Sequence, residues 1–159
     1  MTEGHGAVTS PILSDPVAYE RRVVESIRDL PGSVFDGFTD DEIGCCIARS
    51  NVIECAAGDR VLKKGGAARN VFVVLSGALE VSNNGRVVGT VRPGEMFGET
   101  AYLLHGSRTF DVDALADSTR ILSLSERTLR NLTDDAPVVA AKLLTNVSKV
   151  LCRRLSKTG

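Results

Sequence analysis

The sequence is poor in the residues that bind structural or catalytic metal ions. It contains two histidines, His5 and His105, and its four cysteines form no Cys-x-x-C pair. Because protein zinc sites need clustered cysteine, histidine or carboxylate ligands, almost no ligand set is available for one. No nucleophile–base pairing suggests hydrolysis either. We therefore expect no metal cofactor and no enzymatic activity.

A long apolar run and an excess of charge of one sign are also missing. No segment approaches the roughly 18–20 apolar residues that cross a bilayer, and the polar N-terminus has no signal peptide. The formal net charge of −1 implies no global attraction to nucleic acid or to an anionic membrane. We expect a soluble, cytoplasmic protein without a membrane span. In a reducing cytosol its cysteines should be small buried apolar residues, and they are Cys45, Cys46, Cys55 and Cys152.

The residues that are present divide the chain into a β-rich centre and helical flanks. The 159 residues allow one domain with flanking helices but not comfortably two. A chain of this mass should bury roughly 70% of the surface that its unfolded form exposes. Residues 1–14 mix Gly, Thr, Ser and single charges without periodicity, and we expect them to be mobile. We predict helices in 15–50, a β-roll in 51–125 and further helices in 126–159.

The centre of the chain shows short apolar runs separated by glycines, a pattern typical of an all-β roll. Glycines such as Gly77 and Gly94 fall at turn positions, where a positive φ carries no Cβ penalty. The sequence Asn83-Asn84-Gly85 predicts a tight hairpin. The predicted strands are 52–56, 60–63, 70–76, 78–82, 86–92, 110–115 and 120–125.

Helix-start signals lie on both sides of the β region. Pro16 begins an amphipathic pattern that predicts a helix over 17–30. Thr39 and Glu42 form a capping-box pattern ahead of a predicted helix over 40–48. Ser125 can cap a helix over 126–132, and a longer helix should follow as far as Leu155. Its apolar stripe predicts a packed face, and we attribute its basic cluster to dipole compensation and solubility. The stripe is Ala140, Leu144, Val147, Leu151 and Leu155, broadened by Leu143 and Val150, and the basic residues are Lys149, Arg153, Arg154 and Lys157.

Residues 97–112, which read FGETAYLLHGSRTFDV, carry the chemistry of a binding site. The chain turns at Gly98 and continues with the pattern of one helical turn. A glycine followed by a short helix presents free backbone N–H groups at a positive dipole end, which suits an anion. Arg108 adds a planar fork of donors matched to phosphate oxygens. Glu99 would repel a phosphate and suits a hydroxyl instead. Together these groups describe a site for a ribose that carries a cyclic phosphate.

This stretch resembles the phosphate-binding cassette of the cyclic nucleotide-binding domain family. In that family Phe-Gly-Glu and a short helix precede Pro-Arg-Ala-Ala-Thr-Val, and the step from Glu99 to Arg108 matches without a gap. The chain departs from the pattern at Ser107, Phe110 and Asp111. The bulk of Phe110 would crowd the pocket unless its ring turns into the core.

The resemblance implies a mainly β fold with flanking helices, namely a jelly-roll barrel with N-terminal helices and a C-terminal helix. In the family that helix lids the pocket, and in many bacterial members it also pairs two protomers. The resemblance also implies a cyclic nucleotide, cAMP or cGMP, as the regulatory ligand. Its phosphate would meet Arg108 and backbone N–H groups, and its ribose hydroxyl would meet Glu99.

The purine should lie between apolar strand residues and the C-terminal helix. We expect Val73 and Leu75 beneath it, and a polar helix residue (Thr145, Asn146 or Ser148) beside it. Thr109 follows the arginine, as in many family members that prefer cGMP, although cAMP binders with that residue also exist. We expect cAMP. The expected ligand-binding residues are Phe97, Gly98, Glu99, Thr100, Arg108, Thr109, Val73 and Leu75.

Other functions stay open at this point. A domain that keeps the barrel for protein contacts and binds no nucleotide is the main alternative, motivated by Phe110 and Asp111. A metal-dependent cupin-type enzyme shares the β-roll pattern, but there is no His-x-His pair. A DNA-binding regulator of the catabolite-activator kind needs several dozen residues after the last helix, so we expect no nucleic-acid partner. The expected partners are a cyclic nucleotide, a second copy of the chain through the C-terminal helix, and an unidentified downstream protein.

Overall fold

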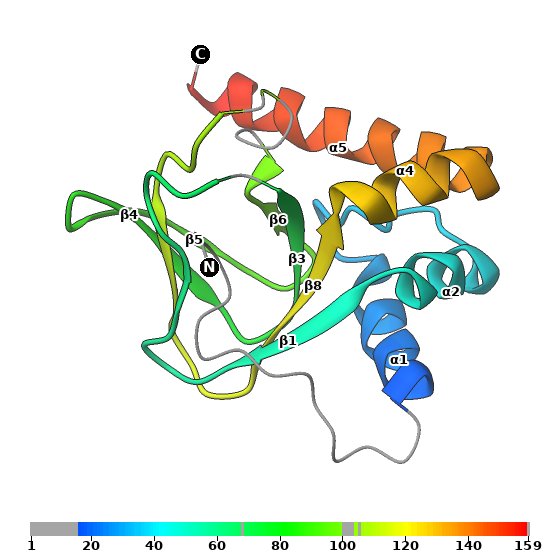
Figure 1. Ribbon diagram of the computed structural model, residues 1–159, viewed down its shortest axis with the longest axis horizontal. Coiled ribbons are helices and arrows are strands. Elements are labelled where there is room, and N and C mark those ends of the chain that lie inside the picture. Colours follow the sequence, from blue (N-terminus) through cyan, green and yellow to red (C-terminus); the bar gives the residue numbers. More distant parts are fainter. Residues whose placement is uncertain (1–15, 68, 100–103, 105, 159) are drawn as a thin grey trace.

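The chain folds into two antiparallel sheets with helices packed beside them (Figure 1). The computed structural model describes residues 16–67, 69–99, 104 and 106–158. Its helices are α1 (Pro16–Arg28), α2 (Asp40–Ala48), α4 (Glu126–Asp135) and α5 (Pro137–Thr158). Its strands are β1 (Asn51–Cys55), β2 (Arg60–Leu62), β3 (Asn70–Ser76), β4 (Leu79–Asn83), β5 (Arg86–Val91), β6 (Met96–Phe97), β7 (Asp111–Ala114) and β8 (Thr119–Ser125).

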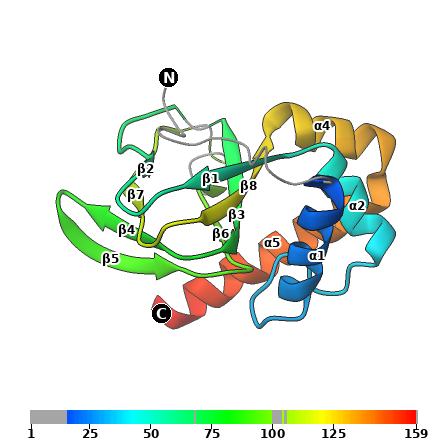
Figure 2. The ribbon, with the colours of Figure 1, turned by 90° about the horizontal axis from the view of Figure 1, so that it is seen from below.

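Each sheet contains four strands. Their orders are β1-β8-β3-β6 and β2-β7-β4-β5, and every pairing is antiparallel. The predicted hairpin at Asn83-Asn84-Gly85 is confirmed, since it joins β4 to β5 with positive φ at Asn84 (53°) and Gly85 (82°). In Figure 2, α1, α2 and α4 lie together beside one end of the sheets, and α5 runs from them past β3 and β6. The predicted mainly β fold with flanking helices is confirmed.

The core lies on both faces of β3, whose middle residues are all buried. Phe72 and Val74 belong to the cluster enclosed by the two sheets, together with residues of β2, β4, β7 and β8. Val73 and Leu75 belong to a second cluster, which the helices share. This division follows from the two-residue period of a strand, because successive side chains point to opposite faces.

The helices begin at the residues that the sequence indicates. The capping box is confirmed, because Thr39 Oγ1 accepts from the Glu42 N–H at 3.2 Å and Glu42 Oε1 accepts from the Thr39 N–H at 2.8 Å. Ser125 accepts from the Thr128 N–H at 3.1 Å, which caps α4. Such caps satisfy N–H groups that have no partner inside the helix.

Two polar side chains fasten the first half of α5 to the segment that leads into α2. Asn146 Nδ2 donates to the backbone oxygens of Val34 (2.8 Å) and Asp36 (3.0 Å), and Asn146 itself is buried. Lys142 Nζ donates to the Gly37 oxygen at 2.7 Å and to Glu42 Oε1 at 2.6 Å. This half of α5 is therefore held to the N-terminal helices as well as to the barrel.

Some element boundaries and faces differ from those expected. Helix α1 ends at Arg28, and α4 continues to Asp135. The strand β6 has only two residues, too few for periodicity to reveal. Within the predicted stripe of α5, Ala140, Leu143 and Val150 are buried, whereas Leu144 and Leu155 are exposed. The expected mobile segment 1–14 lies outside the described residues. Among the helices that the structure describes, none is long and apolar enough to cross a membrane.

Candidate functional site

An open cavity of about 910 Å³ lies between the sheets and the end of α5. Its wall comes from β4, β5, β6, the segment before β7 and the last turns of α5. The volume falls in the range of about 300–1,000 Å³ that is usual for small-molecule sites. Among the expected ligand-binding residues, the cavity brings together Phe97, Gly98, Glu99, Arg108 and Thr109.

Arg108 lies in the wall of this cavity and is only 3% exposed. Its Nη1 donates to the Gly98 oxygen at 2.6 Å, and its Nη2 donates to the Asn70 oxygen at 2.7 Å. The guanidinium carbon lies 5.7 Å from the centre of the Phe72 ring, which stacks on Phe97 with 5.0 Å between ring centres. A cation over an aromatic face is stabilised by the ring quadrupole. The position of the guanidinium is therefore fixed on several sides.

Gly98 is required at its position for two reasons. Its φ of +80° lies in a region that side chains other than glycine rarely adopt. A β-carbon added there would lie 2.7 Å from Arg108 Nη1 and 3.4 Å from the Phe72 ring. The glycine thus allows the turn after β6 and the close approach of the arginine to that turn.

Glu99 follows this glycine and is 4% exposed. Its Oε1 accepts a short charge-assisted hydrogen bond from Arg154 Nη1, and Arg154 Nη2 also donates to the Met96 oxygen at 2.8 Å. A buried carboxylate is costly unless it is paired and hydrogen-bonded, and Arg154 supplies that pairing from α5. The predicted role of Arg154 in solubility alone is wrong. The sequence contains one indication that Arg154 belongs to the site. Arg154 lies three residues after Leu151, so the two side chains share one face of the helix, and both line the cavity.

Phe110 and Asp111, the two departures that motivated the alternative function, take different positions. Phe110 lines the cavity and is 39% exposed, and an open volume remains beside it. The Asp111 carboxylate accepts from the Lys64 N–H at 2.7 Å and lies 3.6 Å from Arg60 Nη1. The next residue, Val112, faces the cavity. The negative charge of Asp111 is therefore compensated by other partners and does not line the site.

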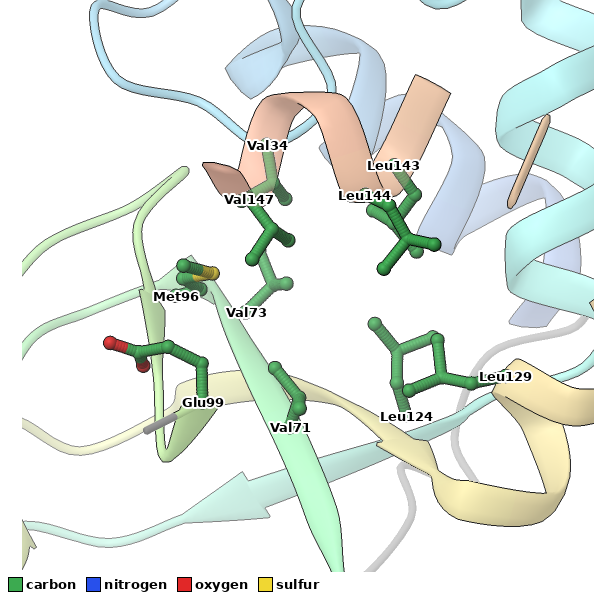
Figure 3. Close-up of a pocket in the computed structure, with 10 residues that line it drawn as sticks. All are labelled: Val34, Val71, Val73, Met96, Glu99, Leu124, Leu129, Leu143, Leu144 and Val147. Carbon is green, nitrogen blue, oxygen red and sulfur yellow. The ribbon is translucent and has the colours of Figure 1, made fainter. Parts of the chain in front are cut away.

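The structure does not bring Val73 and Leu75 to this cavity. Both are buried on the helical side of β3. Val73 lines a separate apolar cavity of about 40 Å³ between the sheet and helices α4 and α5 (Figure 3). Both residues thus lie on the face of β3 away from the larger cavity, which the sequence could not indicate because buried residues on both faces of β3 leave no polar alternation to set the register. The strand residues that line the larger cavity include Val81 and Val88.

The polar residues expected beside the base are also engaged elsewhere. The hydroxyl groups of Thr145 and Ser148 donate to carbonyl oxygens of their own helix, and Asn146 donates to the segment before α2. The residues of α5 that line the cavity lie later in the helix: Leu151, Arg154 and Leu155. Thr100, His5 and His105 lie outside the described residues.

Four exposed apolar side chains, together called the apolar rim, line the larger cavity. Val88 (52% exposed), Leu104 (75%), Phe110 (39%) and Leu155 (70%) all line it. Large exposed apolar side chains that gather around one cavity are typical of a binding surface. The site therefore joins an arginine and a carboxylate to an apolar rim, as an amphipathic ligand requires.

The expected burial of the cysteines is confirmed for Cys46 and Cys55 and is wrong for Cys152, which is exposed. The two buried thiols are unreactive. Burial raises the pKa of the Cys46 thiol to about 12 and that of the Cys55 thiol to about 11. A thiol with so high a pKa is a poor nucleophile and a poor metal ligand near neutral pH. Within the described ranges, no group of three or more His, Cys, Asp or Glu residues is placed to hold a metal ion.

Comparison with known proteins identifies the family. The sequence profile of the cyclic nucleotide-binding domain matches residues 52–136, more than half of the chain. The chain belongs to the cyclic nucleotide-binding domain family. A solved cyclic nucleotide-binding domain from Methylobacillus flagellatus superposes with a TM-score of 0.78 at 18% identity, covering 96% of this chain and 85% of that one. At this identity the superposition shows a shared fold.

Curated relatives are much longer proteins. Glutaminase 2 of Bradyrhizobium diazoefficiens is 32% identical over 117 residues, which are 72% of this chain and 18% of that protein. A cGMP-dependent protein kinase of Caenorhabditis elegans is 41% identical over 61 residues, which are 38% of this chain and 8% of the kinase. This cyclic nucleotide-binding domain thus spans less than a fifth of either relative.

Proposed function

We propose that this domain binds one cyclic purine nucleotide in the larger cavity and transmits that binding through α5. The observation that carries the proposal is the buried Arg108 guanidinium in the cavity wall, beside the turn at Gly98. Its hydrogen bonds to neutral backbone oxygens can be exchanged for bonds to a phosphate. Charge-assisted hydrogen bonds are roughly twice as strong as neutral ones, so the phosphate is the preferred partner.

Glu99 is proposed to accept the ribose 2′-hydroxyl. It directly follows Gly98, and both residues line the cavity with Arg108. The base is proposed to pack on the apolar rim, between Val88 on β5 and Leu155 on α5. A purine covers such side chains and removes their surface from water, which stabilises the complex.

We propose cGMP ahead of cAMP as the preferred ligand, reversing the expectation from the sequence alone. Thr109 follows Arg108, is exposed and lines the cavity, so its hydroxyl is available to accept from the exocyclic amino group of guanine. A relative that is 41% identical over the matched residues is named as a cGMP-dependent kinase. Separate titrations with cGMP and cAMP decide the order.

The proposed coupling of ligand binding to α5 is based on the residues that line the larger cavity. Leu151, Arg154 and Leu155 of α5 line the same cavity as the barrel residues, so a ligand contacts both parts. A ligand shifts a conformational equilibrium only as far as its affinities for the two states differ. Contact with α5 supplies that difference. A homodimer through α5 and a downstream protein that reads its position remain part of this proposal.

Thermal unfolding tests the proposed function. A ligand that binds the native state stabilises it by about 2.7 kcal/mol at roughly 100 times Kd, which should raise Tm by several degrees in a chain of this size. An unchanged Tm in saturating cGMP and cAMP would favour the alternative, a barrel that serves protein contacts only. That alternative loses one motivation, since the Asp111 charge lies against Arg60 and the Lys64 N–H.

A further inference from the structure

We propose that the Phe110 ring stacks on the purine base of the nucleotide and strengthens the binding of cGMP and cAMP alike. This inference rests on the proposed function, because it names a further contact for the ligand of the larger cavity. It gives a binding role to a position where this chain carries a large aromatic ring and the family's pattern has a small residue.

The fold uses the other four phenylalanines and leaves Phe110 outside the core. The chain contains five phenylalanines in all. Four of them are at most 4% exposed and pair as rings, Phe35 with Phe38 and Phe72 with Phe97. Phe110 is 39% exposed and, within the residues that the structure describes, belongs to neither core cluster. An aromatic ring that the core does not use, in the wall of a cavity, is suited to ligand binding.

Phe110 lies close to the proposed phosphate anchor. Arg108, Thr109 and Phe110 all line the larger cavity. Residues two positions apart have α-carbons at most about 7 Å apart, so Arg108 and Phe110 start from neighbouring points of the wall. In a cyclic nucleotide the base and the phosphate are attached to the same ribose. A nucleotide whose phosphate meets Arg108 therefore has its base within reach of the Phe110 ring.

The ring forms part of the wall without filling the cavity. The cavity lined by Phe110 has a volume of about 910 Å³, near the upper end of the usual range of about 300–1,000 Å³ for small-molecule sites. The carboxylate of the next residue, Asp111, accepts from the Lys64 N–H and lies near Arg60. The bulk of Phe110 thus adds contact surface for a base, and the neighbouring negative charge is held elsewhere.

Stacking on Phe110 differs from contact with the aliphatic members of the apolar rim. Val88 and Leu155 offer apolar surface, whereas Phe110 also offers a π face that can lie against the face of a base. Every base has such a face, so stacking does not depend on the hydrogen-bonding groups that distinguish guanine from adenine. Phe110 should therefore contribute equally to the binding of cGMP and cAMP, and Thr109 should set the preference between them.

Calorimetric titrations with cGMP and cAMP compare wild type with Phe110→Ala, Phe110→Leu and Leu115→Ala. Leu115 is the matched control, because it is 47% exposed and is not among the described residues that line the cavity. Phe110→Ala should bind both nucleotides about fivefold to thirtyfold more weakly, the lower part of the range for base–aromatic stacking. Phe110→Leu keeps an apolar side chain without a π face and should fall between. Leu115→Ala should bind as wild type does.

The outcomes separate the stacking from the proposed function. If wild type binds and Phe110→Ala binds equally well or more tightly, the stacking is overturned alone, and tighter binding would show that the ring crowds the site. A loss of affinity for only one of the two nucleotides would also overturn it. If wild type binds neither nucleotide, the proposed function fails and the stacking fails with it.

Fluorescence gives a second measurement, which also serves if Phe110→Ala does not fold. Because the chain contains no tryptophan, Phe110→Trp introduces a single fluorophore into the cavity wall, and Leu115→Trp is its control. A stacked purine quenches indole fluorescence. Addition of cGMP should therefore reduce the emission of Phe110→Trp in parallel with calorimetric saturation and leave that of Leu115→Trp unchanged. Constant emission of Phe110→Trp at concentrations where calorimetry shows bound cGMP would overturn the stacking.

Discussion

The Gly98 oxygen accepts a 2.6 Å hydrogen bond from Arg108, and a β-carbon on Gly98 would lie 2.7 Å from the same guanidinium nitrogen. The backbone of one residue therefore both holds and makes room for the side chain of the other. Because the φ of Gly98 is +80°, the conformation that allows this contact is itself available mainly to glycine. The turn and the arginine form one structural unit.

Gly98→Ala should disrupt that unit. We expect a loss of roughly 1–3 kcal/mol in the free energy of unfolding, since alanine is strained at positive φ and its β-carbon displaces Arg108. Affinity for the cyclic nucleotide should fall with it. Urea unfolding and calorimetric titration measure the two effects. Gly106→Ala is the matched control, because a β-carbon there meets nothing within 4 Å and no positive φ is required. Equal effects of both variants would contradict this account of Gly98.

Val73→Ala and Val88→Ala should separate the core from the ligand site. Val73 is 1% exposed on the helical side of β3, so its truncation should cost about 1–3 kcal/mol of stability and leave ligand affinity nearly unchanged. Val88 is 52% exposed and lines the larger cavity, so its truncation should weaken binding and change stability by less than about 0.5 kcal/mol. Weaker binding by the Val73 variant alone would restore the expectation that Val73 lies beneath the purine.

Glu42 should make stability depend on pH in the acid range. The hydrogen bond from Lys142, followed by that from the Thr39 N–H, lowers the pKa of Glu42 below its ordinary value of 4.5. The ionised form is thus favoured in the folded state, and its stabilisation is present above about pH 4.5. It is lost as the pH falls through the lower pKa of the folded protein. The stability difference between wild type and Glu42→Gln, measured by urea unfolding, should therefore shrink between neutral pH and pH values well below 4.5. A stability difference between wild type and Glu42→Gln that does not change with pH would contradict this role of Glu42. The control is Glu126→Gln, which changes an exposed carboxylate.

Local sequence patterns could predict much of the fold. The capping box at Thr39 and Glu42, the cap at Ser125 and the hairpin at Asn84 depend on residues a few positions apart, and all three are confirmed. The candidate binding stretch is also recognisable in the sequence, because Gly98, Glu99 and Arg108 belong to one short segment. These features need no knowledge of the tertiary structure.

The remaining features depend on contacts between distant segments. Arg154 lies 55 residues from Glu99, and a basic cluster at a helix end has the same composition whether it is solvated or paired. Which face of β3 lies between the two sheets was not predictable either, since both faces are buried and carry apolar residues. The exposure of Leu144 and the burial of Val150, both within the predicted stripe, depend on how α5 packs on the rest of the chain, to which the Asn146 hydrogen bonds hold it.

Calorimetric titration of cGMP and cAMP into wild type and Arg108→Ala tests the central claim most directly. Wild type should bind, and the variant should lose about 1.5–3 kcal/mol of binding free energy, since the buried charge-assisted hydrogen bonds to phosphate disappear. Arg108→Lys should fall between them, because an ammonium keeps the charge but not the planar fork. Equal affinity of wild type and Arg108→Ala for either nucleotide would contradict the claim that this arginine anchors the ligand.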